Sequence, residues 1–161
     1  MKEWYLAYTK PKSEDNVAYR LAGAGFDVLN PKIKERRYCR RKMTDIISPL
    51  FPCYLFVKFN SSTDYHLISY TRGIKRVLMN DNGPAAVPQE LIDSITERLK
   101  DGCITIKPSF TPGQTVVIKG GPFEGLDAVF EKEMKSIERV AVLLKVINVR
   151  VVVDGRMLAN G

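Results

Sequence analysis

The sequence CYLFVKF, residues 53–59, predicts the central strand of a β-sheet. Successive residues of a strand lie on opposite faces, so Leu55 and Val57 share one face while Tyr54 and Phe56 share the other. Both faces are rich in apolar side chains. The strand is therefore either covered on both sides, or it offers one face as a docking surface.

The residues before this strand predict a second strand and a helix. Residues 3–9, EWYLAYT, alternate in the same way and form the expected strand. Pro11 ends the strand, Ser13 can cap a helix, and Gly23 and Gly25 can end that helix. The expected apolar stripe of the helix is Val17, Leu21 and Ala24.

The residues that follow continue the mixture of strands and helices. We expect strands at residues 26–29 and 74–79, and a short helix that carries His66. Pro88 suits the first position of a further helix, whose apolar stripe is Leu91, Ile92, Ile95 and Leu99. This order predicts an α+β domain over residues 1–100, with one sheet flanked by helices.

The pattern changes after a linker that we place at residues 101–109. Short β-branched runs, separated by turn residues, predict strands at residues 116–118, 128–130, 140–144 and 146–153. Asp154-Gly155 is a hairpin-turn pair. So many short strands in a small segment predict a β-barrel domain over residues 110–161.

The composition limits the class of protein. The chain has 161 residues, 25 Lys and Arg against 18 Asp and Glu, and a net charge of +7, which favours a phosphate-rich partner. No apolar run approaches the roughly 18–20 residues of a membrane helix. The start of the chain has no signal-peptide pattern. We therefore expect a cytoplasmic protein without a membrane partner.

The residues that usually carry catalysis or bind metals are sparse. Cys39, Cys53 and Cys103 are far apart and odd in number, so we expect reduced thiols rather than disulfides. With His66 as the single histidine, a structural zinc site is not expected. The sequence has no P-loop, no dinucleotide fingerprint and no evident carboxylate pair. We expect neither an enzyme nor a bound cofactor.

The positive charge is concentrated in one segment. Residues 32–42 hold seven basic residues and one acidic residue, a net charge of +6. Two interpretations stay open: the solvated tip of a hairpin, or a finger that contacts phosphates, with Tyr38 as a stacking surface. The basic residues are Lys32, Lys34, Arg36, Arg37, Arg40, Arg41 and Lys42.

Several segments resemble a known family. FTPGQTVVIKGGPFEGLDAVF, from residue 110, resembles a KOW motif. In order along the chain, WYLAYTKPKSE, LFPCYLFVKF, TRGIKRVL and VPQELI resemble the signature segments of the NusG N-terminal (NGN) domain. The chain is short and has little linker, so it most resembles the specialised RfaH-type members of the NusG family. The resemblance implies an NGN-type antiparallel sheet flanked by helices, followed by a KOW barrel.

The resemblance also implies polymerase-binding residues. Family members bind the clamp helices of the largest RNA polymerase subunit, and the matching positions are Tyr8, Tyr54 and Phe56. Aromatic residues suit a binding hot spot, although core packing beneath a helix is the alternative for each. In RfaH-type proteins, a His-Thr-Thr element touches the pincer of RNA polymerase that lies opposite the clamp helices. Here it reads His66-Leu67-Ile68, so His66 is either that contact or an ordinary surface histidine.

Basic residues match positions that approach non-template DNA in RfaH-type proteins. Phosphate contacts would supply affinity there, whereas exposed solubilising charge is the alternative. Thr71 belongs to this set because the segment TRG matches the family. Together with the basic segment, the predicted nucleic-acid-binding residues are Lys10, Lys12, Arg20, Arg36, Arg37, Arg40, Arg41, Lys42, Thr71 and Arg72.

The resemblance raises a question of regulation. In RfaH-type proteins the C-terminal domain can dock on the NGN domain as a helical hairpin, mask the polymerase site, and refold into a barrel on release. An inter-domain ion pair holds the closed state. Its acidic position is Ser48 here, which predicts that Arg139, at the basic position, has lost its partner. The β-branched residues of 140–153 favour strand, so we expect a stable barrel; a fold-switching helical form is the alternative.

The sequence thus predicts a bacterial NusG-family elongation factor, a specialised antiterminator that binds RNA polymerase and non-template DNA and suppresses pausing or termination. The alternative within the family is a general NusG that acts with Rho. The alternative of another class is a ribosome-associated RNA-binding protein. We expect a monomer whose KOW domain recruits the ribosome or Rho.

Overall fold

The computed structural model describes residues 1–105 and 136–147. Its main sheet has β1 (Glu3–Thr9) and β5 (Tyr54–Phe59) as the inner antiparallel pair. Three shorter strands complete the sheet: β2 (Asp27–Leu29), which pairs with β5, and β6 (Ile74–Val77) and β9 (Ala86–Val87), which pair with β1. All of these pairs are antiparallel, which confirms the α+β class and the central place of residues 53–59.

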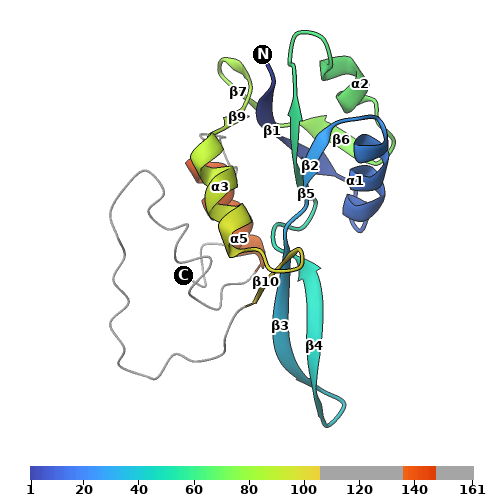
Figure 1. Cartoon of the computed structure of the whole chain (residues 1–161), viewed down its shortest axis with the longest axis vertical. Coiled ribbons are helices and arrows are strands. Elements are labelled where there is room, and N and C mark those ends of the chain that lie inside the picture. The colour runs from blue at the N-terminus through green and yellow to red at the C-terminus, as the bar shows by residue number, and fades with distance from the viewer. Residues whose placement is uncertain (106–135, 148–161) are drawn as a thin grey trace, which may run out of the picture.

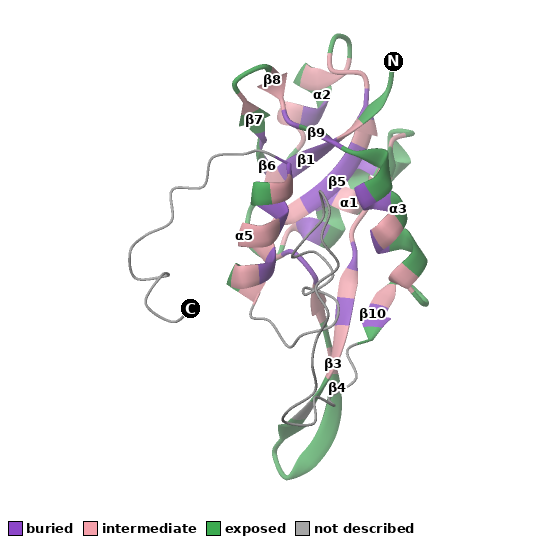
Figure 2. Cartoon of the chain, turned by 90° about the vertical axis from the view of Figure 1, so that its left-hand side faces the viewer, coloured by how far each residue is buried: buried purple, intermediate pink, exposed green. Residues whose placement is uncertain are grey.

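Helices cover both faces of this sheet (Figure 1). The helices α1 (Glu14–Gly23) and α2 (Tyr65–Ser69) lie on one face. The helices α3 (Gln89–Arg98) and α5 (Ser136–Val146) lie on the other. Figure 2 shows the buried positions concentrated along β1 and β5, between the two helical layers. The strand at residues 53–59 is therefore covered on both sides, one of the two options that its pattern left open.

The alternation along β1 and β5 separates two hydrophobic clusters. On the α1 side, Val17 and Leu21 pack among Tyr5, Leu55 and Val57. Ala24, predicted to continue this stripe, is instead exposed beyond the end of the helix. On the α3 and α5 side, the buried residues from the sheet and α3 include Leu6, Phe56, Leu91, Ile92 and Ile95.

The basic segment forms a long hairpin. Its strands β3 (Lys32–Cys39) and β4 (Lys42–Pro49) pair antiparallel along their whole length and project from the body of the molecule (Figure 1). Ile33, at the base, is fully buried, whereas residues 38–45 are all exposed. The hairpin therefore stands on a buried root and carries a solvated tip.

Residues 103–105, which the sequence placed in a linker, are a strand instead. This strand, β10 (Cys103–Thr105), pairs in parallel with β3 and buries Ile104. Apolar burial beside Ile33 explains why the segment is ordered here. The first domain thus extends beyond residue 100.

The remaining elements follow the sequence with small differences. The predicted strand at residues 74–79 is divided, because β6 ends at Val77 and β7 (Met79–Asn80) pairs with β8 (Gly83–Pro84). Pro88 lies at the N-cap of α3 rather than inside the helix. Ser13 lies at the N-cap of α1, but its hydroxyl makes no capping hydrogen bond.

The predicted strand at residues 140–144 is wrong in this structure, because these residues lie within α5. Val140, Leu143, Leu144 and Ile147 recur at helical spacing and face the main domain, where they join its hydrophobic cluster. This burial outweighs the modest β preference of the branched residues, since tertiary packing overrides propensity.

Other predictions for the C-terminal segment lie outside the described residues. They are the strands at 116–118 and 128–130, most of the strand at 146–153, and the hairpin turn at Asp154-Gly155. The assignment of residues 110–161 to a KOW domain stays a prediction, because the structure describes only residues 136–147 of this segment.

Candidate functional site

The first candidate surface is an aromatic pair at the ends of β1 and β5. Tyr8 and Tyr54 are directly opposite in register, and their ring centroids are 5.1 Å apart. Both rings are half-buried at the edge of the hydrophobic cluster. Burial raises the pKa of the Tyr54 hydroxyl, and the neighbouring Tyr8 adds to the effect. The structure thus brings two of the predicted polymerase-binding residues together.

Two cations that the sequence analysis missed complete this surface. The Lys75 ammonium lies 5.2 Å from the centroid of the Tyr8 ring, and the Arg76 guanidinium carbon lies 5.6 Å from it. Both side chains are exposed. Such cations are attracted by the face of the ring. The adjacent Lys-Arg pair, one residue after the TRG segment, was the available sequence signal.

Phe56 is placed differently from the two tyrosines. It is fully buried and meets Phe51 edge to face, with 6.0 Å between ring centroids. In this arrangement Phe56 is therefore a core residue packed beneath a helix, which was the alternative interpretation.

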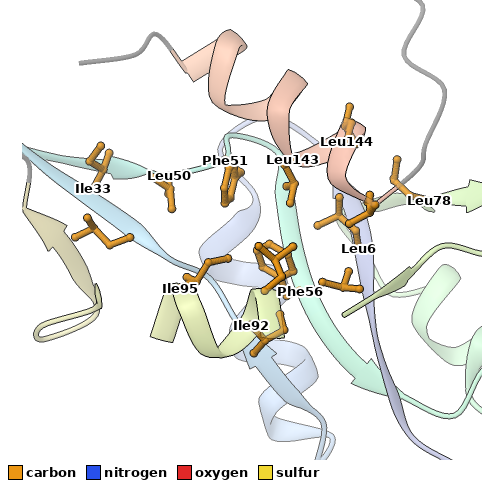
Figure 3. Packing of buried hydrophobic residues seen from close by; sticks show 14 residues of the cluster. Leu6, Ile33, Leu50, Phe51, Phe56, Leu78, Ile92, Ile95, Leu143 and Leu144 are labelled. Carbon is orange, nitrogen blue, oxygen red and sulfur yellow. The ribbon is translucent and has the colours of Figure 1, made fainter. Parts of the chain in front are cut away.

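The helix above this face is α5. Figure 3 shows Leu143 directed toward Phe51 and Phe56, and Leu144 belongs to the same cluster as Leu6 and Leu78. Leu143 is fully buried, and Leu144 is 6% exposed. A segment more than 80 residues away in sequence thus covers the face on which Tyr8 and Tyr54 lie.

Arg139 anchors this helix, and the prediction that it has lost its partner is wrong. Its Nε donates a hydrogen bond of 2.9 Å to the carbonyl oxygen of Leu50. Its Nη1 lies 3.8 Å from a carboxylate oxygen of Glu35, and the two side chains are 4% and 13% exposed. Ser48 is not this partner; Glu35, on the adjacent strand of the hairpin, supplies the acid instead.

A group of predicted nucleic-acid-binding residues meets beside α1. The Lys10 backbone N–H donates a 2.8 Å hydrogen bond to the carbonyl oxygen of Gly73. Lys10, Lys12 and Arg72 are therefore on adjoining loops, and all three are exposed. The Thr71 hydroxyl donates to the Leu67 carbonyl oxygen at 2.8 Å, so it serves an internal turn. Arg20 is exposed in the last turn of α1.

The other predicted nucleic-acid-binding residues lie along the hairpin. Arg36, Arg40, Arg41 and Lys42 are exposed, and Arg37 pairs with Thr44 in the same ladder. Asp45 lies 3.6 Å from Arg36 Nε and 3.7 Å from Lys34 Nζ. The structure thus confirms a hairpin for this segment, while its binding role stays a prediction.

His66 does not lie with Tyr8 and Tyr54. It is exposed on α2, across the sheet from the face that carries the two tyrosines. Its ring stacks on Tyr70, with an interplanar angle of 12° and 6.1 Å between centroids. Tyr70, which the sequence analysis did not assign, is 83% exposed beside it. The predicted polymerase contacts therefore fall on two separate surfaces.

Residues 1–105 and 136–147 hold no cluster of three or more His, Cys, Asp or Glu side chains that could bind a metal ion. Within the same residues, no helix is long and apolar enough to span a membrane.

The described residues thus form an α+β sheet domain with an aromatic pair at the edge of the cluster that α5 joins, exposed basic loops and a basic hairpin. The family profile described as "Transcription termination factor nusG" matches residues 2–96, more than half of the chain. The chain belongs to the NusG family of transcription termination and antitermination factors.

One curated protein and one solved structure are similar to this chain. The "Transcription termination/antitermination protein NusG" of Xylella fastidiosa (strain 9a5c) is 25% identical over 170 residues, which cover 89% of this chain and 91% of the relative. The structure "Domain interaction in Thermotoga maritima NusG" aligns with a TM-score of 0.40 and 19% identity, and covers 60% of this chain and 56% of that chain. The structural match therefore spans little more than half of the Thermotoga chain.

Proposed function

We propose that this chain is a specialised antiterminator that binds RNA polymerase through the sheet face carrying Tyr8, Tyr54 and Phe56. The observation that carries the proposal is the position of α5 over that face. A surface that accepts an amphipathic helix of its own chain has the shape and apolarity to accept helices of a partner. The clamp helices of the largest polymerase subunit would take the place of α5.

In this proposal the arrangement with α5 docked is a closed state. Phe56 has no exposed surface there, so a partner cannot reach it until α5 leaves. Burial of Leu143, Leu144 and Ile147 stabilises the closed state by about 1.5–3 kcal/mol for each side chain, as an upper estimate. Spontaneous opening is therefore rare, and a recruiting signal at the polymerase would be needed.

The exposed basic residues would make the contacts that recruit the closed chain. Lys10, Lys12 and Arg72 form a group that α5 does not cover, so it is available to DNA before opening. Arg20 and Thr71 extend this group, and the hairpin residues Arg36, Arg37, Arg40, Arg41 and Lys42 form a second one. His66 would make the second polymerase contact from the opposite side of the sheet. Contacts to the exposed non-template strand would recruit the closed chain to polymerase.

The proposal is tested by releasing the helix in the full-length chain. Leu143→Asp places a carboxylate in the apolar cluster, and so should raise the affinity for RNA polymerase at least about tenfold. The matched control is Lys145→Asp, because Lys145 is exposed on the same helix. Adding Tyr54→Ala to Leu143→Asp should reverse the gain. An unchanged affinity for the Leu143→Asp chain, with the fold retained, would contradict a masked site.

The specialised role needs its own measurement. A gel shift with assembled elongation complexes that differ only in the non-template strand should show a preferred sequence. Equal binding to all complexes, together with dependence of termination on Rho, would favour a general NusG instead.

A further inference from the structure

The turn of the β3–β4 hairpin is strained. Arg40 and Arg41 form its two-residue loop, with φ angles of 49° and 64°. These values lie in the left-handed region, where a side chain crowds the backbone and non-glycine residues are uncommon. Two-residue loops of this kind strongly prefer Asn-Gly or Asp-Gly. Consecutive arginines are thus a poor choice for folding.

Strain of this kind usually persists where function requires it. Asn-Gly would form the turn at lower cost, yet the chain places two arginines at the end of the hairpin that projects from the body (Figure 1). Among the described residues, neither arginine takes part in an ion pair, and the same holds for Lys42. Three adjacent cations at the tip therefore have no acidic partner in the described part of the chain.

The cations also occupy both faces of the hairpin. In the β3–β4 register, Arg36 and Lys34 share one face with Asp45, whereas Lys42 lies on the other face opposite Cys39. A ribbon that lay flat on a single strand of phosphates would need cations on one face only. Cations on two faces and at the tip suit a ribbon placed between two rows of phosphates.

The dimensions agree with one kind of groove. The exposed end, from Arg36 to Asp45, has about four residues in each strand and extends roughly 13 Å from the body. The major groove of B-form DNA is about 12 Å wide and 8.5 Å deep and admits a two-stranded β-ribbon. The major groove of A-form RNA is too narrow for side chains to read.

We propose that the β3–β4 hairpin inserts into the major groove of double-stranded DNA. Arg40 and Arg41 reach toward the floor of the groove, while Arg36 and Lys42 contact the phosphates of the two bordering strands. The inference deepens the proposed function and rests on its assignment of DNA as a partner, but it names duplex DNA rather than the exposed single strand. It also requires no opening of α5, because the tip is exposed in the closed chain.

The test replaces the strained turn by the one that folding prefers. Arg40→Asn with Arg41→Gly keeps the hairpin and removes two cations, so the thermal midpoint should be unchanged or higher. Fluorescence anisotropy with a labelled 20-base-pair DNA duplex at about 50 mM salt should show affinity lowered about tenfold. Arg36→Gln with Lys42→Gln, which removes the two phosphate-facing cations, should lower the slope of log K against log salt concentration by about two, one unit for each cation.

The controls separate groove insertion from general charge. Lys2→Asn with Lys100→Gln removes two exposed cations elsewhere and should lower the affinity less than twofold. A single DNA strand and an RNA duplex of the same length should bind the wild-type chain several-fold more weakly than duplex DNA. Equal effects of the turn variant and of this control variant would overturn the proposal, as would equal binding of the three probes or no measurable binding of duplex DNA. Because polymerase is absent, failure here leaves the polymerase assay with Leu143→Asp independent.

Discussion

The Nε of Arg139 donates a hydrogen bond to the Leu50 carbonyl oxygen at 2.9 Å, across 89 residues of sequence. The same guanidinium lies beside Glu35, so one side chain of α5 contacts both the β3 strand of the hairpin and the segment directly after β4. The buried Arg139 side chain therefore joins the docked helix to the root of the hairpin.

Arg139→Ala should loosen α5 without unfolding the first domain. The change removes this donor from the Leu50 carbonyl oxygen and the Glu35 carboxylate in a buried setting. Breaking a buried charged pair costs about 3–5 kcal/mol. Faster hydrogen exchange of the α5 amides is the measurement. Lys145→Ala, on the exposed side of the same helix, is the control and should leave exchange unchanged. Equal exchange in both variants would show that Arg139 does not anchor the helix.

Tyr54→Ala should weaken polymerase binding while the domain stays folded. Tyr54 is only partly buried and its ring packs on Tyr8, so truncation removes an aromatic contact at the docking face without opening the core. Loss of a hot-spot residue costs about 2 kcal/mol or more, which is at least tenfold in affinity. Tyr54→Phe keeps the ring and should retain most of the binding. If Tyr54→Ala abolishes the near-ultraviolet circular dichroism of the domain, the residue is a core residue instead.

Gly73→Ala should destabilise the domain more than Gly25→Ala. Both glycines have positive φ, 100° and 91°, so the backbone penalty is similar. A Cβ at position 73 would lie 2.6 Å from Val17 Cγ2, whereas a Cβ at position 25 meets nothing within 4 Å. Overpacking against a stiff valine adds about 1–3 kcal/mol. Urea unfolding of the two variants gives the difference directly, and equal midpoints would contradict the clash.

Cys53 should make the fold sensitive to alkaline pH. Burial raises the pKa of its thiol above the ordinary 9.0, and the Glu14 carboxylate raises it further. The folded chain then holds this proton more tightly than the unfolded chain, so the stabilisation is present below about pH 9 and is lost as the pH rises through the folded pKa. Cys53→Ser should flatten the dependence of unfolding free energy on pH between 8 and 10.

The control for that experiment is Cys103→Ser, which removes a thiol elsewhere in the domain. Glu14→Gln should lie between the two, because it removes the second cause of the pKa shift while the amide oxygen can still accept the 2.8 Å hydrogen bond from the Cys53 N–H. Identical pH profiles for Cys53→Ser and Cys103→Ser would remove Cys53 as the source.

Local patterns predicted most of the first domain. Alternation in residues 3–9 and 53–59 identified the two inner strands, because a strand buried between two helical layers must be apolar on both faces. The basic hairpin followed from its charge. The same reasoning failed at residues 140–144, where branched residues favour strand in isolation but become helical against Phe56 and Leu6.

The candidate site was predictable only in part, for a related reason. Tyr8 and Tyr54 were predicted because they match the polymerase-binding positions of the NusG family, and aromatic residues suit a binding hot spot. Glu35 could not be identified as the partner of Arg139, since the contact joins residues more than 100 positions apart. The cations over Tyr8 depend on the register of β1 against β6, which a single sequence does not define.

The contact between Arg139 and Glu35 should couple the evolution of two distant parts of the gene. A change of Glu35 would remove this carboxylate from beside a buried arginine, and a change of Arg139 would remove this guanidinium from beside the carboxylate. Either single change is costlier than both together. Among relatives that keep this helix docked, we therefore expect exchanges at positions 35 and 139 to occur in pairs.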